Sequence, residues 1–156
     1  MEMTTLDWLL GQGGVDLLDD GLAFTVHPSW IVPGEDRLSY TTLIRLVECC
    51  REHHWIKDVL PKAEGIIVDS TIKSIAGEFT RSILVGSAAL MKYEIADVRS
   101  KGYSLRFQVY IRDSFEVVAR FCLVSIFIDD SQHQAVFPPP DVLEYLVKAC
   151  KKTLRR

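Results

Sequence analysis

The sequence lacks the features that would commit it to a metal, a disulfide framework or a nucleic acid. Its four cysteines form no C-x-x-C pair and have no metal-ligand spacing to the four histidines, so neither a zinc site nor a set of disulfides is expected. There are 18 Lys and Arg against 21 Asp and Glu, for a formal net charge of −3. This is not the basic excess that phosphate contacts usually require, and nucleic acid is not an expected partner.

Long apolar runs are also missing. No stretch approaches the roughly 18 apolar residues that a membrane-spanning helix needs, and the polar start MEMTTLDW does not resemble a signal sequence. We therefore expect a cytoplasmic protein that does not enter a membrane. With 156 residues, 48% of them hydrophobic and 25% charged, the chain has the length and composition of one packed domain.

The clearest helical pattern runs from Ser39 to about Leu60, just ahead of Pro61. Apolar side chains recur there every three or four residues and fall on one side, while polar side chains gather on the other. The apolar side carries Tyr40, Leu43, Leu46, Val47, Cys50 and His54, and the polar side carries Thr41, Arg45, Glu48 and Glu52. The pattern predicts a long helix with one face against another element.

Beyond residue 65 the apolar residues alternate with a period near two, which is typical of strands. The expected strands cover residues 22–26, 66–79, 88–98, 103–111 and 115–128, and short turns make the last three antiparallel neighbours. The sequence predicts a single α+β domain, residues 1–156, in which a curved antiparallel sheet of about five strands wraps the long helix. Residues 1–20 form an N-terminal extension, and residues 141–156 form a small C-terminal helix that begins after three prolines.

Three stretches of sequence carry a family resemblance. The helix entered at Leu38-Ser39-Tyr40 continues to Glu48-x-x-Arg51, the run 79–87 reaches a glycine before the next strand, and the strand 118–129 is followed by prolines. In these stretches, and in the order of its elements, the chain resembles the hotdog-fold acyl-CoA thioesterases related to 4-hydroxybenzoyl-CoA thioesterase. The resemblance implies a hotdog fold and hydrolysis of an acyl thioester, carried by coenzyme A or by an acyl-carrier protein.

The same resemblance bears on cofactors and assembly. It implies no metal or redox cofactor, with coenzyme A present only as part of the substrate. It also implies a homodimer or a dimer of dimers, because members of the family pair with the acyl site between subunits.

Thioester hydrolysis needs hydrogen-bond donors for the carbonyl oxygen. The amides around Ser39 and Tyr40 could supply them, because the first amides of a helix have no helical acceptor and lie at the positive end of the helix dipole. Arg51, from the family's Glu-x-x-Arg pair, and Ser87, after Gly86, complete the expected substrate-binding residues. Ser87 is equally explained as a turn residue.

Three carboxylates could activate the attacking water. In one branch of the family an Asp precedes the helix; aligning on Glu48 and Arg51 puts Pro33 there, with Glu35 and Asp36 just after it. Another branch uses a carboxylate from the helix itself, the place of Glu48. Each has a structural alternative: Glu35 and Asp36 as carboxylates at a helix start, and Glu48 as part of a surface charge network.

Two functions are compatible with these residues. The first is an acyl-CoA or acyl-carrier thioesterase. The second is a hotdog module that binds an acyl thioester or acyl chain without hydrolysing it, which the absence of the loop Asp would permit. A hotdog dehydratase is a weaker third option, because its His-and-acid pair is not recognisable.

Overall fold

The computed structural model describes residues 8–9, 11, 13–63, 69–129 and 131–154. The strands are β1 (Val15–Leu18), β2 (Gly21–Thr25), β3 (Asp69–Phe79), β4 (Ala88–Arg99), β5 (Gly102–Ile111), β6 (Val117–Asp129) and β7 (Gln134–Ala135). The two long helices are α2 (Tyr40–His54) and α3 (Pro140–Leu154). A π-helical turn, Trp55–Val59, and a 3-10 turn, Leu60–Lys62, follow α2, so the helix predicted at 39–60 changes its winding before Pro61.

The strands form one sheet in the order β1-β2-β4-β5-β6-β3, with β7 paired to β6. The expected number of about five strands is too low, because β1 pairs antiparallel with β2 from Val15↔Phe24 to Leu18↔Gly21. β1 has only four residues, too few for a period-two pattern to be recognised. Of the expected strand 66–79, residues 66–68 lie outside the described residues, as do residues 1–7, 10 and 12 of the N-terminal extension.

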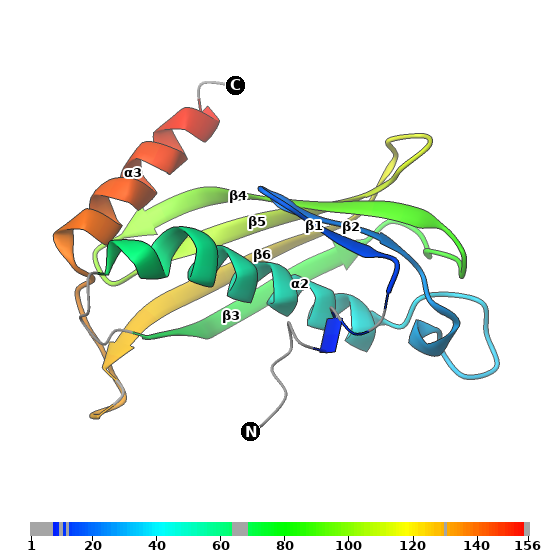
Figure 1. The fold of residues 1–156 in the computed structure, drawn as a ribbon, viewed down its shortest axis with the longest axis horizontal. Coiled ribbons are helices and arrows are strands. Elements are labelled where there is room, and N and C mark those ends of the chain that lie inside the picture. Colours follow the sequence, from blue (N-terminus) through cyan, green and yellow to red (C-terminus); the bar gives the residue numbers. More distant parts are fainter. Residues whose placement is uncertain (1–7, 10, 12, 64–68, 130, 155–156) are drawn as a thin grey trace. The chain divides into compact units, whose positions relative to one another are not determined.

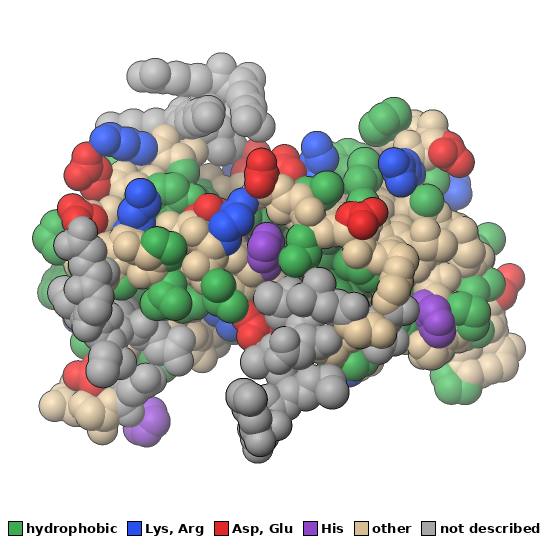
Figure 2. Space-filling model, viewed as in Figure 1, with side chains coloured by type: hydrophobic (Ala, Val, Ile, Leu, Met, Phe, Trp, Pro, Cys, Tyr) green, Lys and Arg blue, Asp and Glu red, His purple; other side chains and the backbone are tan. Residues whose placement is uncertain are grey.

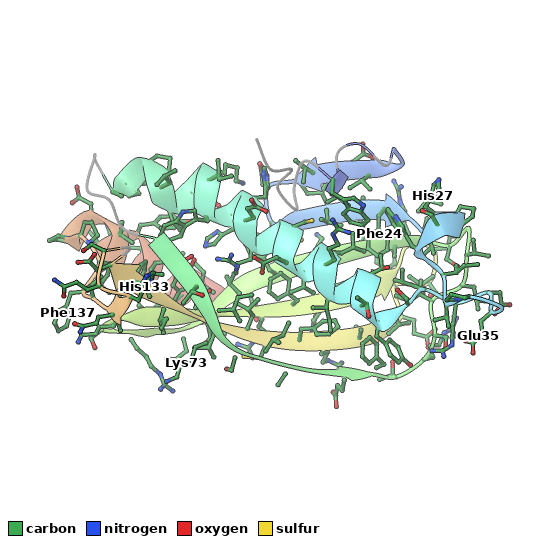
Figure 3. The ribbon with its side chains drawn as sticks, turned by 90° about the horizontal axis from the view of Figure 1, so that it is seen from below. Phe24, His27, Glu35, Lys73, His133 and Phe137 are labelled. Carbon is green, nitrogen blue, oxygen red and sulfur yellow. The ribbon has the colours of Figure 1, made fainter. Side chains whose placement is uncertain are left out.

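The chain divides into two compact units, of which the first comprises residues 1–53, 78–93 and 107–120. In this unit α2 covers one face of the strands (Figures 1 and 3), and Cys50 Sγ lies 3.5 Å from Met91 Sδ on β4. The apolar side predicted for α2 is buried at Leu43, Leu46, Val47 and Cys50, whereas Tyr40 is 46% exposed. Other large, fully buried side chains of this unit include Leu9, Leu22, Trp30, Met91 and Phe107.

The second unit comprises residues 54–77, 94–106 and 121–156. His54, at the end of α2, is buried, with Nδ1 3.3 Å from Asp58 Oδ2 and its ring edge-on to Tyr103. The burial of this side chain agrees with the predicted place of His54 on the apolar side of the helix. The predicted C-terminal helix is α3, which buries Val142 and Leu146.

Two further features concern the helices and the surface of the described residues. No helix among them is long and apolar enough to cross a membrane. On the face drawn in Figure 2, the coloured basic and acidic side chains are interspersed, and neither sign gathers into a patch.

Candidate active site

The start of α2 is fixed by backbone hydrogen bonds to two other segments of the first unit. Leu38 N–H donates to the Ile83 carbonyl at 2.7 Å, and Ser39 N–H donates to the Trp30 carbonyl at 2.9 Å. Trp30 is itself fully buried, 1% exposed. The position of the first helical turn is therefore set by the core, and the groups it presents are held in place.

Ser39 is the N-cap of α2. Its hydroxyl oxygen accepts a hydrogen bond from Thr42 N–H at 3.1 Å and its hydroxyl donates to Thr42 Oγ1 at 2.7 Å, which is the side-chain cap that a serine at this position is expected to form. Within the described part of the chain, no group accepts a hydrogen bond from the amides of Tyr40 or Thr41. These two amides can bind an external oxygen.

An aromatic pair lies beside these amides. The Tyr40 ring packs on Phe79, at the end of β3, with ring centroids 4.0 Å apart. The guanidinium of Arg37 lies 5.4 Å from the centroid of the Tyr40 ring. Tyr40 is predicted as a site residue from its place at the helix entry. No local pattern indicates Phe79 or Arg37 as its neighbours, because only the folded backbone brings these side chains together.

The two loop carboxylates are exposed. Glu35, labelled in Figure 3 in the loop ahead of α2, forms an ion pair with Arg37, whose pKa is raised chiefly by the hydrogen bond to the Glu35 carboxylate. Asp36 is held through its backbone, since its carbonyl accepts a hydrogen bond from Val85 N–H at 2.8 Å. Glu35 is therefore already matched to a cation, while the Asp36 side chain faces solvent.

Glu48 lies on α2 and forms a forked ion pair with Arg51. Arg51 Nη2 donates to Oε1 at 2.6 Å and Arg51 Nε donates to Oε2 at 3.0 Å. The Glu48 side chain is 27% exposed and that of Arg51 13%, against 45% for Glu35. Glu48 is therefore more buried than Glu35. Its bidentate pair with Arg51 also fixes the orientation of the carboxylate.

Tyr40 and Glu48 are too far apart to act on one substrate within a single chain. Eight residues separate them, which corresponds to about 12 Å along a helix that rises 1.5 Å per residue. A base must lie within about 3 Å of the proton that it takes, or reach it through one water. The amides of Tyr40 and Thr41 can thus act together with Glu48 only if a second copy provides it, whereas Asp36 precedes Tyr40 by four residues in the same chain.

Ser87 belongs to the turn between β3 and β4. Its carbonyl accepts a hydrogen bond from Val26 N–H at 3.0 Å and its amide donates to the Leu84 carbonyl at 3.1 Å. Neither of these bonds involves the start of α2. Its described contacts are those of a turn residue.

The cysteines behave as small buried or surface side chains. Cys49 and Cys50 are both fully buried; burial, followed by the nearby Glu52, raises the pKa of Cys49 to about 12, and burial raises that of Cys50 well above its ordinary value. A thiol in this state is a poor nucleophile. In the described residues, no three His, Cys, Asp or Glu side chains are grouped so as to hold a metal ion.

This chain is similar to known proteins in its three-dimensional structure. No protein-family model matches this chain, and a comparison with curated proteins gives no match. Slr0204 from Synechocystis, a 1,4-dihydroxy-2-naphthoyl-CoA thioesterase, superposes with a TM-score of 0.68 at 9% identity, over 80% of this chain and 93% of that one. SAV2348 from Staphylococcus aureus, solved in complex with CoA, superposes with a TM-score of 0.71 at 11% identity, over 87% of this chain and 88% of that one.

A third solved structure is a longer chain. The 12:0-ACP thioesterase from Umbellularia californica superposes with a TM-score of 0.70 at 12% identity, over 81% of this chain and 52% of that one. Together with the helix on an antiparallel sheet and the small C-terminal helix, these likenesses show that the chain has the hotdog fold. The fold predicted from the order of elements is confirmed.

Proposed function

We propose that this protein hydrolyses acyl thioesters and that its active site is completed by a second copy of the chain. The observation that carries the proposal is the capped start of α2, with two amides available beside the Tyr40–Phe79 pair. Such amides stabilise the negative charge that develops on a thioester carbonyl oxygen under attack. Solved structures of the same fold include a CoA thioesterase and an ACP thioesterase, which supports this class of substrate.

The second copy follows from the spacing of residues on α2. Tyr40 and Ile44 are exposed apolar side chains, 46% and 44%. With Glu48 they follow one another at four-residue steps, each turned by roughly 40°, and form a ridge that runs from the edge of the apolar side to the edge of the polar side of the helix. Ile44 is midway between the other two. If two α2 helices pair antiparallel about a twofold axis near Ile44, Tyr40 of one copy lies beside Glu48 of the other.

The reaction then proceeds with Glu48 as general base. Glu48 of one copy takes a proton from a water molecule, and the resulting hydroxide attacks the carbonyl carbon whose oxygen is bound at Tyr40 and Thr41 of the other copy. Collapse of the tetrahedral intermediate breaks the C–S bond, and the leaving thiolate takes up the proton. Arg51 holds the Glu48 carboxylate in one orientation. No metal or redox cofactor takes part in these steps, and coenzyme A enters only with the substrate.

Release of free thiol from a panel of acyl-CoAs tests the proposal. We expect wild type to release thiol and Glu48→Gln to lose about two orders of magnitude or more in kcat, the usual contribution of a positioned base. Asp36→Asn and the matched control Glu52→Gln, one turn further along α2, should stay near wild type. If Asp36→Asn loses the activity and Glu48→Gln retains it, the base lies in the loop of the same chain.

The alternative function has its own signature in this experiment. If wild type binds acyl-CoA but releases no thiol at any chain length, the protein is a binding module. The forked ion pair of Glu48 with Arg51 is the observation that favours this alternative, because both carboxylate oxygens already accept hydrogen bonds from Arg51 and fewer lone pairs remain for a water molecule.

Assembly is tested separately. Ile44→Asp, which puts a charge at the proposed axis, should convert a dimer into a monomer in sedimentation velocity and abolish thiol release at the same time. Ile56→Asp is the matched control, because Ile56 is 48% exposed but lies outside α2. A wild-type monomer that hydrolyses thioesters would contradict the shared site.

A further inference from the structure

A contact at the N-terminal end of the chain bears on the same carboxylate. The Trp8 ring lies over the guanidinium of Arg45 on α2, 3.8 Å from its centroid, and packs against Trp30 with centroids 6.1 Å apart. The next residue, Leu9, is fully buried. Leu9 therefore anchors the segment in the core, and Trp8 is held on the polar side of α2.

Arg45 is the cation that would otherwise compete for Glu48. It precedes Glu48 by three residues, a spacing at which helical side chains of opposite charge pair, and both act electrostatically on Cys49, the residue after Glu48. Nevertheless, Glu48 is hydrogen-bonded to Arg51, and among the described ion pairs Arg45 has none with Glu48. The Arg45 guanidinium is instead stacked on an indole, the best cation–π partner among side chains.

We propose that Trp8 is a positioning residue that keeps Arg45 away from Glu48. The charged groups of α2 around Glu48 are Arg45, Arg51 and Glu52, and among the described residues ahead of β1 the uncharged Trp8 lies against Arg45. With Trp8 in place, Glu48 has one cationic partner rather than two. A guanidinium of Arg45 on this carboxylate would occupy an oxygen that the attacking water needs and would favour the ionised form. This inference rests on the proposed role of Glu48 and adds a determinant of its basicity from outside the helix.

Kinetics of thiol release test the inference with four variants. Trp8→Ala should lower kcat about 1.5- to twofold and move the acid limb of the pH–rate profile about 0.2 to 0.4 unit to lower pH, the size of effect expected from a helical ion pair. Trp8→Phe keeps a ring for Arg45 and should stay near wild type. Arg45→Gln removes the competing charge, so Trp8→Ala in an Arg45→Gln background should restore the position of the acid limb.

A loss of packing alone would give a different result. If Trp8→Ala lowers kcat without moving the acid limb, or if the shift persists in the Arg45→Gln background, Trp8 does not act through Arg45 and the inference is overturned. Neither outcome affects the proposed hydrolysis, which fails only if wild type releases no thiol.

If wild type releases no thiol, the inference can still be tested by a measurement without substrate. The Nε–H proton of Arg45, followed by NMR, should respond to Glu48→Gln in a Trp8→Ala background, because the two side chains are then in contact. It should not respond to Glu48→Gln when Trp8 is present. An equal response in both backgrounds would overturn the inference.

Discussion

The hydroxyl oxygen of Ser39 accepts a hydrogen bond from the backbone amide of Thr42 at 3.1 Å. This bond satisfies the third amide of α2 and leaves those of Tyr40 and Thr41 for a ligand. One side chain thus both stabilises the helix start and borders the proposed oxyanion site, and substitutions at residue 39 can separate these two roles.

Ser39→Ala should lose mainly stability, whereas Ser39→Asp should lose mainly activity. Ser39→Ala removes the cap and should lower the free energy of unfolding by about 1 kcal/mol, with a modest effect on kcat. Ser39→Asp retains a capping oxygen, so its stability should stay close to wild type. Its carboxylate, however, repels a developing oxyanion at the neighbouring amides, and kcat should fall by about two orders of magnitude.

Urea denaturation and thiol release measure the two effects on the same samples. If Ser39→Asp hydrolyses thioesters at the wild-type rate, the carbonyl oxygen is not bound at the start of α2. If Ser39→Ala is as stable as wild type, the hydrogen bond to Thr42 contributes nothing to the helix.

A site shared between two copies can be restored by mixing two inactive variants. In a heterodimer of Ser39→Asp and Glu48→Gln, one site combines the intact helix start of the Glu48→Gln copy with the intact Glu48 of the Ser39→Asp copy. Random exchange of equal amounts makes half of the dimers mixed, with one active site in two, so thiol release should recover to about a quarter of wild type. No recovery, although exchange is demonstrated with tagged chains, would contradict a site built from two copies.

The sequence predicted the features that depend on local periodicity. The change from a period near 3.6 to a period near two placed α2 and the four long strands, and the order of these elements predicted the fold. β1 was missed because four residues are too few to show alternation. The contacts of Tyr40 with Phe79 and of Arg45 with Trp8 join residues far apart in the sequence, so they depend on how the segments pack, and no local pattern reports them.

The β1–β2 hairpin brings a glycine against another strand. A Cβ added to Gly21 would lie 1.8 Å from the carbonyl oxygen of Met91 and 2.8 Å from its carbonyl carbon. Backbone atoms of a paired strand cannot move aside without loss of the ladder between β2 and β4. Gly21→Ala should therefore destabilise the protein by about 3 kcal/mol, the upper range for overpacking.

Gly34 is the matched comparison for this prediction. Its φ is +78°, and an added Cβ would meet nothing within 4 Å, so Gly34→Ala should cost only the left-handed backbone penalty of about 1 kcal/mol. Chemical denaturation of the two variants gives both values. A Gly21→Ala variant no less stable than Gly34→Ala would show that β2 does not approach β4 this closely.

Stability at alkaline pH should depend on a thiol inside the first unit. Cys49 is fully buried, and its pKa is raised by burial and then by Glu52 from 9.0 to about 12. The unfolded chain therefore loses this proton at a lower pH than the folded protein. The stability linked to the neutral thiol is complete below pH 9 and is lost as the pH rises toward 12, at up to about 1.4 kcal/mol per pH unit.

Unfolding free energies measured at pH 8 and pH 10.5 test this linkage. Wild type should lose about 2 kcal/mol more between these values than Cys49→Ala, in which the titrating group is gone. The exposed Cys122 supplies the control, since Cys122→Ala should follow the wild-type curve. The pKa of Tyr145 is raised from 10.0 to about 12 by burial and then by Asp58, so this residue causes a further loss of unfolding free energy at the alkaline end. That further loss should persist in Cys49→Ala and disappear in Tyr145→Phe. If Cys49→Ala and wild type fall in parallel, the thiol of Cys49 is accessible to solvent in the folded protein, and this side of α2 is not packed as the structure shows.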